Sequence, residues 1–281
     1  MLPTTPPAKA HSPDPVPDPA GLVARLRAAG CVFAEEEAAL LLEAAGSSVE
    51  LERLAAARVT GVPIEQLLGW VDFCDLRIAV EPGVFVPRRR TALLVEEAAR
   101  LLAPADVVLD LCCGTGAIGA ALLAAVPGIV LHAADVEPAA VACARRNLPT
   151  AEVHQGDLFA ALPETLRGQI DVVACNAPYV PTDAITLMPP EARDHELRVT
   201  LDGGVDGLAV LRRMVAEAPS WLAPGGAVLF EVGARQLSAA EAILAEGGFT
   251  PRSASDPEIG ATAVVGSLRG PEISGTPAAG R

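Results

Sequence analysis

The residues with the clearest chemical potential form one tetrapeptide, Asn176-Ala177-Pro178-Tyr179. It follows an apolar run at residues 170–175, which is typical of a buried strand, so the Asn176 amide is expected at the carboxyl edge of a sheet. The side-chain oxygen of Asn176 and the backbone carbonyl of Ala177 can accept the two N–H groups of a planar nitrogen, while Pro178 keeps Ala177 extended. Tyr179 offers a π-face to a planar group. Two fixed acceptors orient such a nitrogen toward an electrophile, so we interpret these residues as catalytic and substrate-binding in methyl transfer to nitrogen.

Further candidates lie at the ends of the three preceding strands and point to an adenosine-containing ligand. Small residues at 112–116 let a ligand approach the backbone where a strand turns into a helix. Asp135, about 20 residues further on, can accept hydrogen bonds from ribose hydroxyls. Asp157 can accept from an adenine amine, with Leu158 covering the ring. The predicted cofactor residues are Asp110, Cys112, Cys113, Gly114, Thr115, Gly116, Asp135, Asp157, Leu158 and Asn176.

The glycine turn favours S-adenosylmethionine over NAD as the cofactor. When the turn is read from Asp110, Cys112 occupies the first glycine position, although Gly114, Gly116 and Gly119 by themselves have the spacing of G-x-G-x-x-G. An S-adenosylmethionine site needs no glycine dedicated to a pyrophosphate, so a cysteine is compatible with that position.

The elements that must position these residues alternate along the chain. Strands are expected at residues 107–111, 130–135, 151–154, 170–175, 227–232, 249–253 and 262–267. Helices are expected at residues 91–102, 117–125, 138–147, 208–222 and 237–246. This alternation predicts an α/β fold with a doubly wound sheet.

The remaining segments differ from this alternating region in periodicity and composition. Helical periodicity at 20–69 predicts a small helical domain, and residues 70–90 predict a hairpin linker before the catalytic domain at 91–268. The proline-rich residues 1–19 and the small, polar residues 269–281 are expected to form flexible tails.

Composition limits the partners. The net charge of −14 argues against nucleic acid, although Arg88-Arg89-Arg90 is a local basic run. No apolar run approaches the ~20 residues that a membrane span needs, so we expect a cytoplasmic protein without membrane contact. Oligomeric state is not encoded in these patterns. No metal-ligand set is evident: His132 and His154 are expected in strands as core or edge residues, and His195 in a solvated loop.

Taken together, the motifs resemble those of the HemK-like, or protein-(glutamine-N5), methyltransferase family, over about residues 20–268. The resemblance rests on segments 63–69, 85–88, 110–116, 176–179, 201–208, 224–226 and 231–233. It implies a Rossmann-like class I methyltransferase domain, a hairpin, and an N-terminal helical domain that recognises a protein substrate. It also implies S-adenosylmethionine as cofactor and a glutamine as acceptor, in the Gly-Gly-Gln loop of a release factor or in a ribosomal protein.

Several positions depart from the family pattern. Ala177 replaces the first proline of Asn-Pro-Pro-Tyr, which keeps the backbone carbonyl, and Leu158 replaces a frequent aromatic residue. Residues 87–92 usually read Pro-Arg-Pro-Glu-Thr-Glu in the family, so Arg90 and Ala92 stand where acidic residues are usual. Leu197 replaces an expected proline. Arg88 keeps its family position and is assigned to substrate binding. These changes indicate a divergent paralogue whose substrate can differ.

Two alternatives remain open. An N6-adenine nucleic-acid methyltransferase would use the same tetrapeptide on an exocyclic amine, but it would need a flipped base and a basic groove. A catalytically silent protein that only binds S-adenosylmethionine is the other alternative. The intact Asn176 and Tyr179 argue against it.

Overall fold

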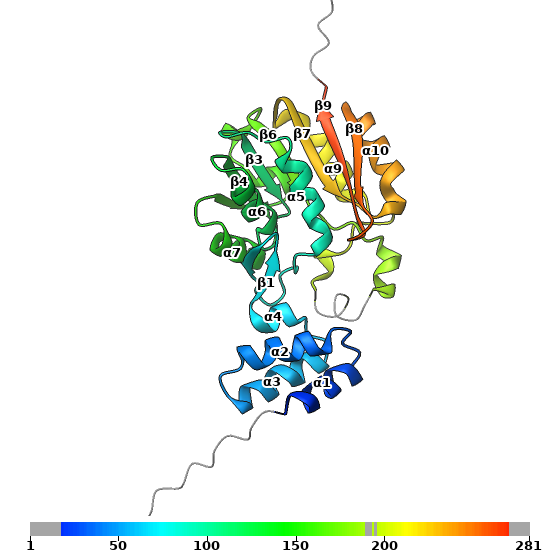
Figure 1. Cartoon of the computed structure of the whole chain (residues 1–281). Coiled ribbons are helices and arrows are strands. Elements are labelled where there is room, and N and C mark those ends of the chain that lie inside the picture. Colours follow the sequence, from blue (N-terminus) through cyan, green and yellow to red (C-terminus); the bar gives the residue numbers. More distant parts are fainter. Residues whose placement is uncertain (1–17, 189–192, 194–195, 270–281) are drawn as a thin grey trace, which may run out of the picture. The chain divides into compact units, whose positions relative to one another are not determined.

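The computed structural model describes residues 18–188, 193 and 196–269. Most of the two expected tails, 1–19 and 269–281, therefore lies outside the described residues, as does His195. The described chain divides into two compact units with a boundary between Leu68 and Gly69 (Figure 1). In the described part, no helix has both the length and the apolar character needed to cross a bilayer.

The first unit is helical, and its helices pack around leucine side chains at helical spacing. Leu26, Leu41 and Leu54 are all buried in one cluster. Glu37 and Arg58 form a buried ion pair beside this cluster, with Nε–Oε2 and Nη2–Oε1 distances of 2.6 and 3.0 Å. The helices are α1 (Pro19–Ala28), α2 (Ala34–Ala44), α3 (Ser48–Val59) and α4 (Ile64–Leu68).

The second unit contains a two-stranded hairpin and a seven-stranded sheet. The hairpin pairs β1 (Trp70–Phe73) with β2 (Leu76–Ala79). The sheet has the order β5-β4-β3-β6-β7-β9-β8, in which neighbours from β5 to β7 are parallel and β9 runs antiparallel to both β7 and β8. Its strands are β3 (Val107–Leu111), β4 (Val130–Asp135), β5 (Glu152–Gln155), β6 (Ile170–Cys175), β7 (Leu222–Glu231), β8 (Phe249–Asp256) and β9 (Ala261–Leu268).

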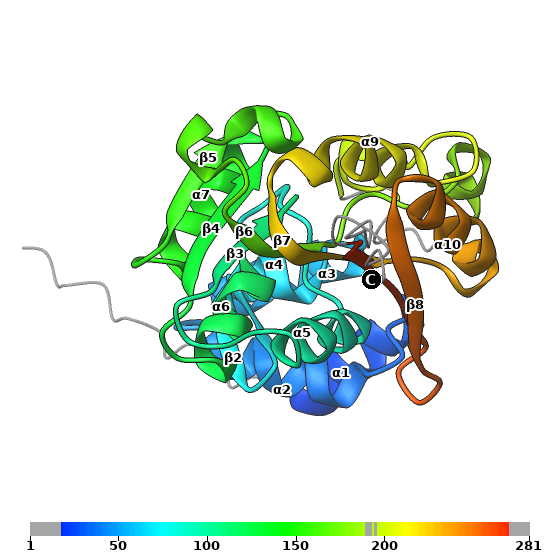
Figure 2. The same cartoon turned by 90° about the horizontal axis from the view of Figure 1, so that it is seen from above.

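Helices cover both faces of this sheet. One apolar cluster joins α5 (Ala92–Ala99), α6 (Ala117–Ala125) and α7 (Pro138–Asn147) to one face. A second joins α9 (Ala209–Glu217) and α10 (Leu237–Glu246) to the other face (Figure 2). The 3₁₀ turns are η1 (Arg89–Thr91), η2 (Leu158–Ala161), η3 (Glu164–Leu166), η4 (Thr182–Leu187), η5 (Arg198–Thr200), η6 (Ala218–Ser220) and η7 (Ala234–Gln236).

This arrangement confirms the predicted α/β fold and gives the sheet a switch point. The chain runs from β3 outward through β4 to β5, then returns to β6 on the opposite side of β3. Ligands of open α/β sheets bind where the strand order reverses, at the carboxyl ends of the strands. The residues that end or follow β3, β4, β5, β6 and β7 therefore converge on one edge.

Candidate functional site

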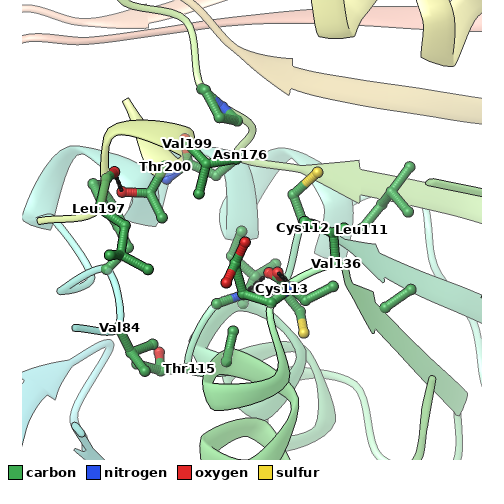
Figure 3. A pocket seen from close by; sticks show the side chains of 18 of the residues that line it. Val84, Leu111, Cys112, Cys113, Thr115, Val136, Asn176, Leu197, Val199 and Thr200 are labelled. Atoms are coloured by element: carbon green, nitrogen blue, oxygen red, sulfur yellow. Dashed lines mark hydrogen bonds between the residues drawn. The ribbon is translucent and has the colours of Figure 1, made fainter. Parts of the chain in front are cut away.

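An open cavity lies at this carboxyl edge. It encloses about 1180 Å³, including the space at its mouth, and its lining is mainly apolar. Figure 3 shows Asn176, Leu197 and Cys112 around it, each from a different segment of the chain. The predicted cofactor residues that line it are Cys112, Cys113, Gly114, Thr115, Asp135, Asp157, Leu158 and Asn176. A mainly apolar lining that carries a few polar groups is typical of a small-molecule or cofactor site.

Asp135 organises the floor of the cavity. Its Oδ2 accepts a hydrogen bond from the Gly114 N–H at 2.8 Å, and its Oδ1 accepts one from the Glu137 N–H at 2.9 Å. Burial raises the pKa of this carboxyl, although the backbone donors oppose the shift. A Cβ at Gly114 would meet no atom within 4 Å, so the glycine leaves open space beside the carboxylate. Each carboxylate oxygen keeps a lone pair for a ligand hydroxyl, which fits the ribose of S-adenosylmethionine.

Asp110 and Gly116 are placed differently from the other predicted cofactor residues, since neither lines the cavity. The Asp110 side chain is completely buried beneath the loop, where its Oδ2 accepts from the Gly119 N–H at 2.9 Å. Burial raises the pKa of Asp110 to about 8. The carboxyl therefore holds the first turn of α6 against β3, which shapes the loop without reaching the ligand space.

The end of β5 contributes a strained turn. Leu158 has a φ of +47° and Cys112, on the β3 side, has a φ of +57°; both are left-handed values that non-glycine residues rarely adopt. Such conformations cluster at functional sites because the surrounding structure must enforce them. Asp157 is exposed, and its Oδ2 accepts from Arg213 Nη2 at 2.7 Å. Leu158 is buried and presents an apolar surface to the cavity.

A second, smaller cavity of about 350 Å³ adjoins the catalytic tetrapeptide. It shares Phe85, Asn176, Pro178 and Thr200 with the first cavity, whereas Ala177 and Tyr179 line only the second. Two ligands, one bound in each cavity, would therefore contact each other beside Asn176. This suits a group transfer in which the donor occupies the larger space and the acceptor side chain the smaller one.

A hydrogen-bond chain fixes the orientation of the Asn176 amide. Its Nδ2 donates to Thr91 Oγ1 at 3.2 Å, and the Thr91 hydroxyl donates to Glu231 Oε2 at 2.7 Å. Because the amide nitrogen is engaged in this way, the side-chain oxygen is left as the acceptor for a ligand. Glu231 ends β7 and is buried, with a relative exposure of 2%.

The same carboxylate also holds Tyr179 and Arg90. Its Oε1 accepts from the Tyr179 hydroxyl at 2.7 Å and from Arg90 Nε at 2.8 Å. The Arg90 guanidinium lies 5.7 Å from the centre of the Tyr179 ring. Burial, reinforced by the Glu231 charge, raises the pKa of Tyr179 well above its usual range, so the phenol remains a donor. Arg90 is thus bound to the tyrosine and carboxylate that flank the smaller cavity.

Arg88, the predicted substrate residue, also lines the smaller cavity. It forms an ion pair with the buried Glu196 carboxylate and lies over the Phe85 ring, 5.0 Å from its centre. The departure residue Leu197 lines the larger cavity beside Val199, and both apolar side chains are more than 40% exposed. Ala92 begins α5.

Thr91 and Glu231 are functional candidates that motif analysis did not single out as site residues. Thr91 lies 85 residues before Asn176 and Glu231 lies 140 residues after Thr91, so no local spacing links them. One indication was available for Glu231. An acidic residue at the carboxyl end of an apolar run such as 227–232 belongs at the same sheet edge as Asn176, provided that the strand is parallel.

Gly207 packs closely against the Tyr179 carbonyl of the tetrapeptide, and replacing it with alanine should lower the stability of the fold. A Cβ there would lie 2.1 Å from the Tyr179 carbonyl oxygen and 2.3 Å from Gln236 Nε2, at a φ of +76°. Left-handed strain together with overpacking is expected to lower the free energy of unfolding by about 3 kcal/mol. Denaturant unfolding measures this. Gly225→Ala is the matched control, because its φ is +83° but no atom lies within 4 Å of the added Cβ; an equal loss in both variants would contradict the proposed clash.

Comparisons with known proteins agree with this geometry. Residues 75–188 match the family model described as Methyltransferase small domain. The release factor glutamine methyltransferase of Geobacter sulfurreducens is 36% identical over 225 residues, which is 77% of this chain and 77% of that protein. The 4-amino-L-phenylalanine/4-methylamino-L-phenylalanine methyltransferase of Streptomyces pristinaespiralis is 36% identical over 209 residues, 71% of each chain.

A solved methyltransferase structure is similar to this chain in fold. The methyltransferase from Pyrococcus furiosus matches with a TM-score of 0.52 at 17% identity, covering 68% of this chain and 88% of that one. At this identity the likeness concerns the fold alone.

Proposed function

The chain belongs to the release factor glutamine methyltransferase family, and we propose that it transfers a methyl group from S-adenosylmethionine to the side-chain amide nitrogen of a glutamine in a protein such as a release factor. The observation that carries this proposal is the pair of adjoining cavities that share Asn176, whose amide oxygen is left as an acceptor.

The cofactor would occupy the larger cavity. Asp135 would accept from its ribose hydroxyls, Asp157 from its adenine amine, and Leu158 would cover the ring. When bound, S-adenosylmethionine supplies an electrophilic methyl group.

The residues at the smaller cavity would orient the glutamine amide. Asn176 Oδ1 and the Ala177 carbonyl would each accept one N–H of that amide, which directs the nitrogen toward the donor cavity. An amide nitrogen is a poor nucleophile because its lone pair is delocalised, so fixed acceptors favour the positive charge that develops on it. The Tyr179 ring, held by Glu231, would pack against the planar group.

A protein substrate is consistent with the surface near the site and with the charge of the chain. Leu197 and Val199 give the rim apolar side chains that suit contact with a peptide loop. The net charge of −14 disfavours nucleic acid. The helical domain, predicted at residues 20–69, is proposed to recognise the protein partner. A cytoplasmic site of action is also proposed, because release factors act on ribosomes.

The test uses the full chain, labelled S-adenosylmethionine and a purified release factor. Label should enter one glutamine-containing peptide, and a release factor whose target glutamine is replaced by alanine should remain unlabelled. Transfer to nucleic acid would overturn the protein-glutamine proposal. So would transfer to a free aromatic amine, the type of substrate for which the Streptomyces pristinaespiralis relative is named.

Asp135→Asn should weaken cofactor binding. The substitution removes the charge and places an amide donor against one of the two backbone N–H groups that Asp135 now accepts. A charged hydrogen bond contributes about 1.5–3 kcal/mol, so the dissociation constant for S-adenosylhomocysteine should rise roughly 10- to 100-fold. Calorimetric titration measures it. Glu258→Gln removes the same single negative charge at an exposed position in the β8–β9 turn, so it should leave the dissociation constant for S-adenosylhomocysteine unchanged.

A further inference from the structure

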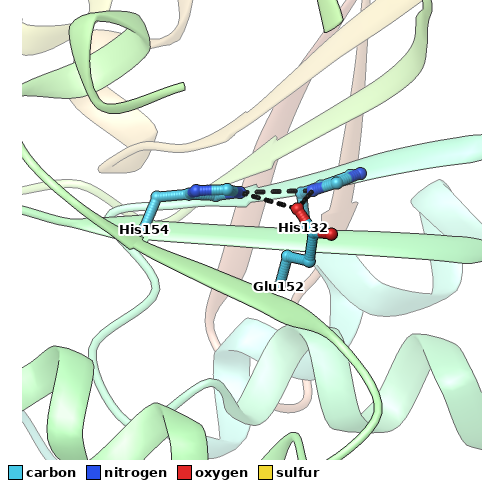
Figure 4. A group of neighbouring side chains, drawn as sticks. All are labelled: His132, Glu152 and His154. Carbon is cyan, nitrogen blue, oxygen red and sulfur yellow. Dashed lines mark hydrogen bonds and ion pairs between the residues drawn. The ribbon is translucent and has the colours of Figure 1, made fainter. Parts of the chain in front are cut away.

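Three metal-ligating side chains meet on the sheet outside both cavities. His132 comes from β4, and Glu152 and His154 come from β5, the edge strand of the sheet. Figure 4 shows the two imidazoles pointing toward each other, with the carboxylate of Glu152 beside the space between them. None of the three lines a cavity described above.

Strand register explains why they meet. Glu152 and His154 are two residues apart on one strand, so their side chains share a face. His132 is paired with Glu152 in the parallel register of β4 and β5, which places it on the neighbouring strand at the same level. Sequence spacing alone indicates no metal-ligand set, because two of the ligands lie in a different strand from the third and the pairing of those strands appears only in the fold.

The distances match those between ligands of one metal ion. His132 Nδ1 and His154 Nε2 are 3.2 Å apart, and Glu152 Oε2 lies 3.6 Å from the first and 3.9 Å from the second. Two nitrogens bound to one tetrahedral zinc ion at about 2.0–2.1 Å stand about 3.3 Å apart. We propose that His132, Glu152 and His154 bind one divalent transition-metal ion of the zinc class.

The surroundings favour neutral imidazoles and allow an ion to enter. Burial lowers the pKa of both His132 and His154, so metal binding does not have to displace protons at neutral pH. Glu152 is exposed, with 71% of its side chain accessible, which leaves an entry path and a coordination position for water. Arg145 is a nearby cation, and its Nη2 donates to the Val153 carbonyl at 2.9 Å. The Glu152 carboxylate counteracts the effect of this positive charge on His154.

A metal ion here would join the edge strand to its neighbour near the cofactor cavity. Asp135 ends β4 three residues after His132, and Asp157 follows β5 three residues after His154. The ion would therefore restrain the two strands whose ends carry Asp135 and Asp157 of the larger cavity. Its effect is structural, and it does not depend on the proposed methyl transfer.

The experiment titrates the chelator-treated, untagged full chain with Co²⁺, followed by its d–d absorbance, and with Zn²⁺ in a calorimeter. We expect saturation at one ion per chain and a rise in Tm with Zn²⁺. His154→Ala and Glu152→Gln should each weaken binding more than about tenfold and abolish the rise in Tm. Both side chains lie on the edge strand, so these variants are expected to fold, and denaturant unfolding in the absence of metal checks that they do.

His11→Ala and His195→Ala serve as matched controls, since each removes one of the other two histidines of the chain. Both should bind metal as the unsubstituted chain does. Absence of saturable binding in the unsubstituted chain would reduce the cluster to a hydrogen bond between two neutral imidazoles and overturn the proposal. Binding that persists in His154→Ala, or that disappears in His11→Ala or His195→Ala, would also overturn it.

Discussion

Replacing Asn176 with alanine is expected to lower kcat for methyl transfer by about 10²–10³-fold, with little change in the dissociation constant of the cofactor product S-adenosylhomocysteine. The alanine removes the side-chain oxygen that is left as an acceptor when Nδ2 donates to Thr91 Oγ1. That oxygen would act most strongly as charge develops on the substrate nitrogen, so its loss should appear in kcat. Single-turnover transfer of labelled methyl measures the effect, and calorimetry measures cofactor binding.

Thr91 provides the matched test of orientation. Thr91→Val keeps the Asn176 amide but removes the hydroxyl between it and Glu231, so kcat should fall about tenfold, and Thr91→Ser should restore it. Normal turnover in Asn176→Ala would remove Asn176 from the proposed mechanism. A parallel loss of turnover and cofactor affinity would make Asn176 a cofactor ligand instead of a substrate acceptor.

The helices and strands around this site could be predicted closely where a glycine, a proline or a polar residue lies within about three residues of the end of the apolar or helical pattern. β3, β4 and β6 have the predicted bounds, and α6, α7 and α10 do as well. In these segments hydrophobic periodicity and the local end signals agree, so local and tertiary preferences favour the same structure.

Boundaries differ where tertiary pairing extends or shortens an element. Within the predicted helix 208–222, the observed α-helix α9 ends at Glu217 and the 3₁₀ turn η6 follows it. The α-helix stops there because Pro219 lacks the N–H that an α-helix needs. β7 then begins at Leu222, five residues before the predicted start, because Leu222 pairs with Ile170 ahead of an irregularity in the register. The placement of antiparallel β9 between β7 and β8 depends on contacts between strands, which alternation along the chain does not encode.

The candidate site likewise contains some residues that the sequence predicts and others that only the fold brings together. Residues that end or directly follow a strand within one motif, such as Asp135 or Asn176, could be identified from that motif because the carboxyl end of a strand lies at the sheet edge. Thr91, Arg90 and Glu231 come from two elements that become neighbours only in the folded sheet. The sequence alone marks Arg90 as a departure from the family pattern, whereas its hydrogen bond to Glu231 depends on the folded sheet.

Replacing Glu231 should destabilise the fold and impair catalysis together. Glu231→Ala leaves Arg90, Thr91 and Tyr179 without their shared acceptor and should lower the free energy of unfolding by about 3–5 kcal/mol. Glu231→Gln preserves the shape, but either placement of its amide deprives at least one donor of an acceptor, which costs about 1–3 kcal/mol. Denaturant unfolding measures both. In the glutamine variant kcat should also fall about tenfold, since Tyr179 and the Thr91–Asn176 chain lose their common anchor.

A purely structural role for Glu231 can be separated from its role in holding Tyr179, because Tyr179 is the only tyrosine in the chain. Ultraviolet titration therefore follows this phenol alone, and its pKa should lie above the usual range because of burial and the Glu231 carboxylate. Removing that charge in Glu231→Gln should lower the pKa of Tyr179, while burial still keeps it above the value for free tyrosine. Tyr179→Phe combined with Glu231→Gln should cost less stability than the sum of the single changes, by about 0.5–3 kcal/mol. Strict additivity, or an unchanged titration of Tyr179 in Glu231→Gln, would mean that the carboxylate stabilises β7 without positioning the catalytic loop.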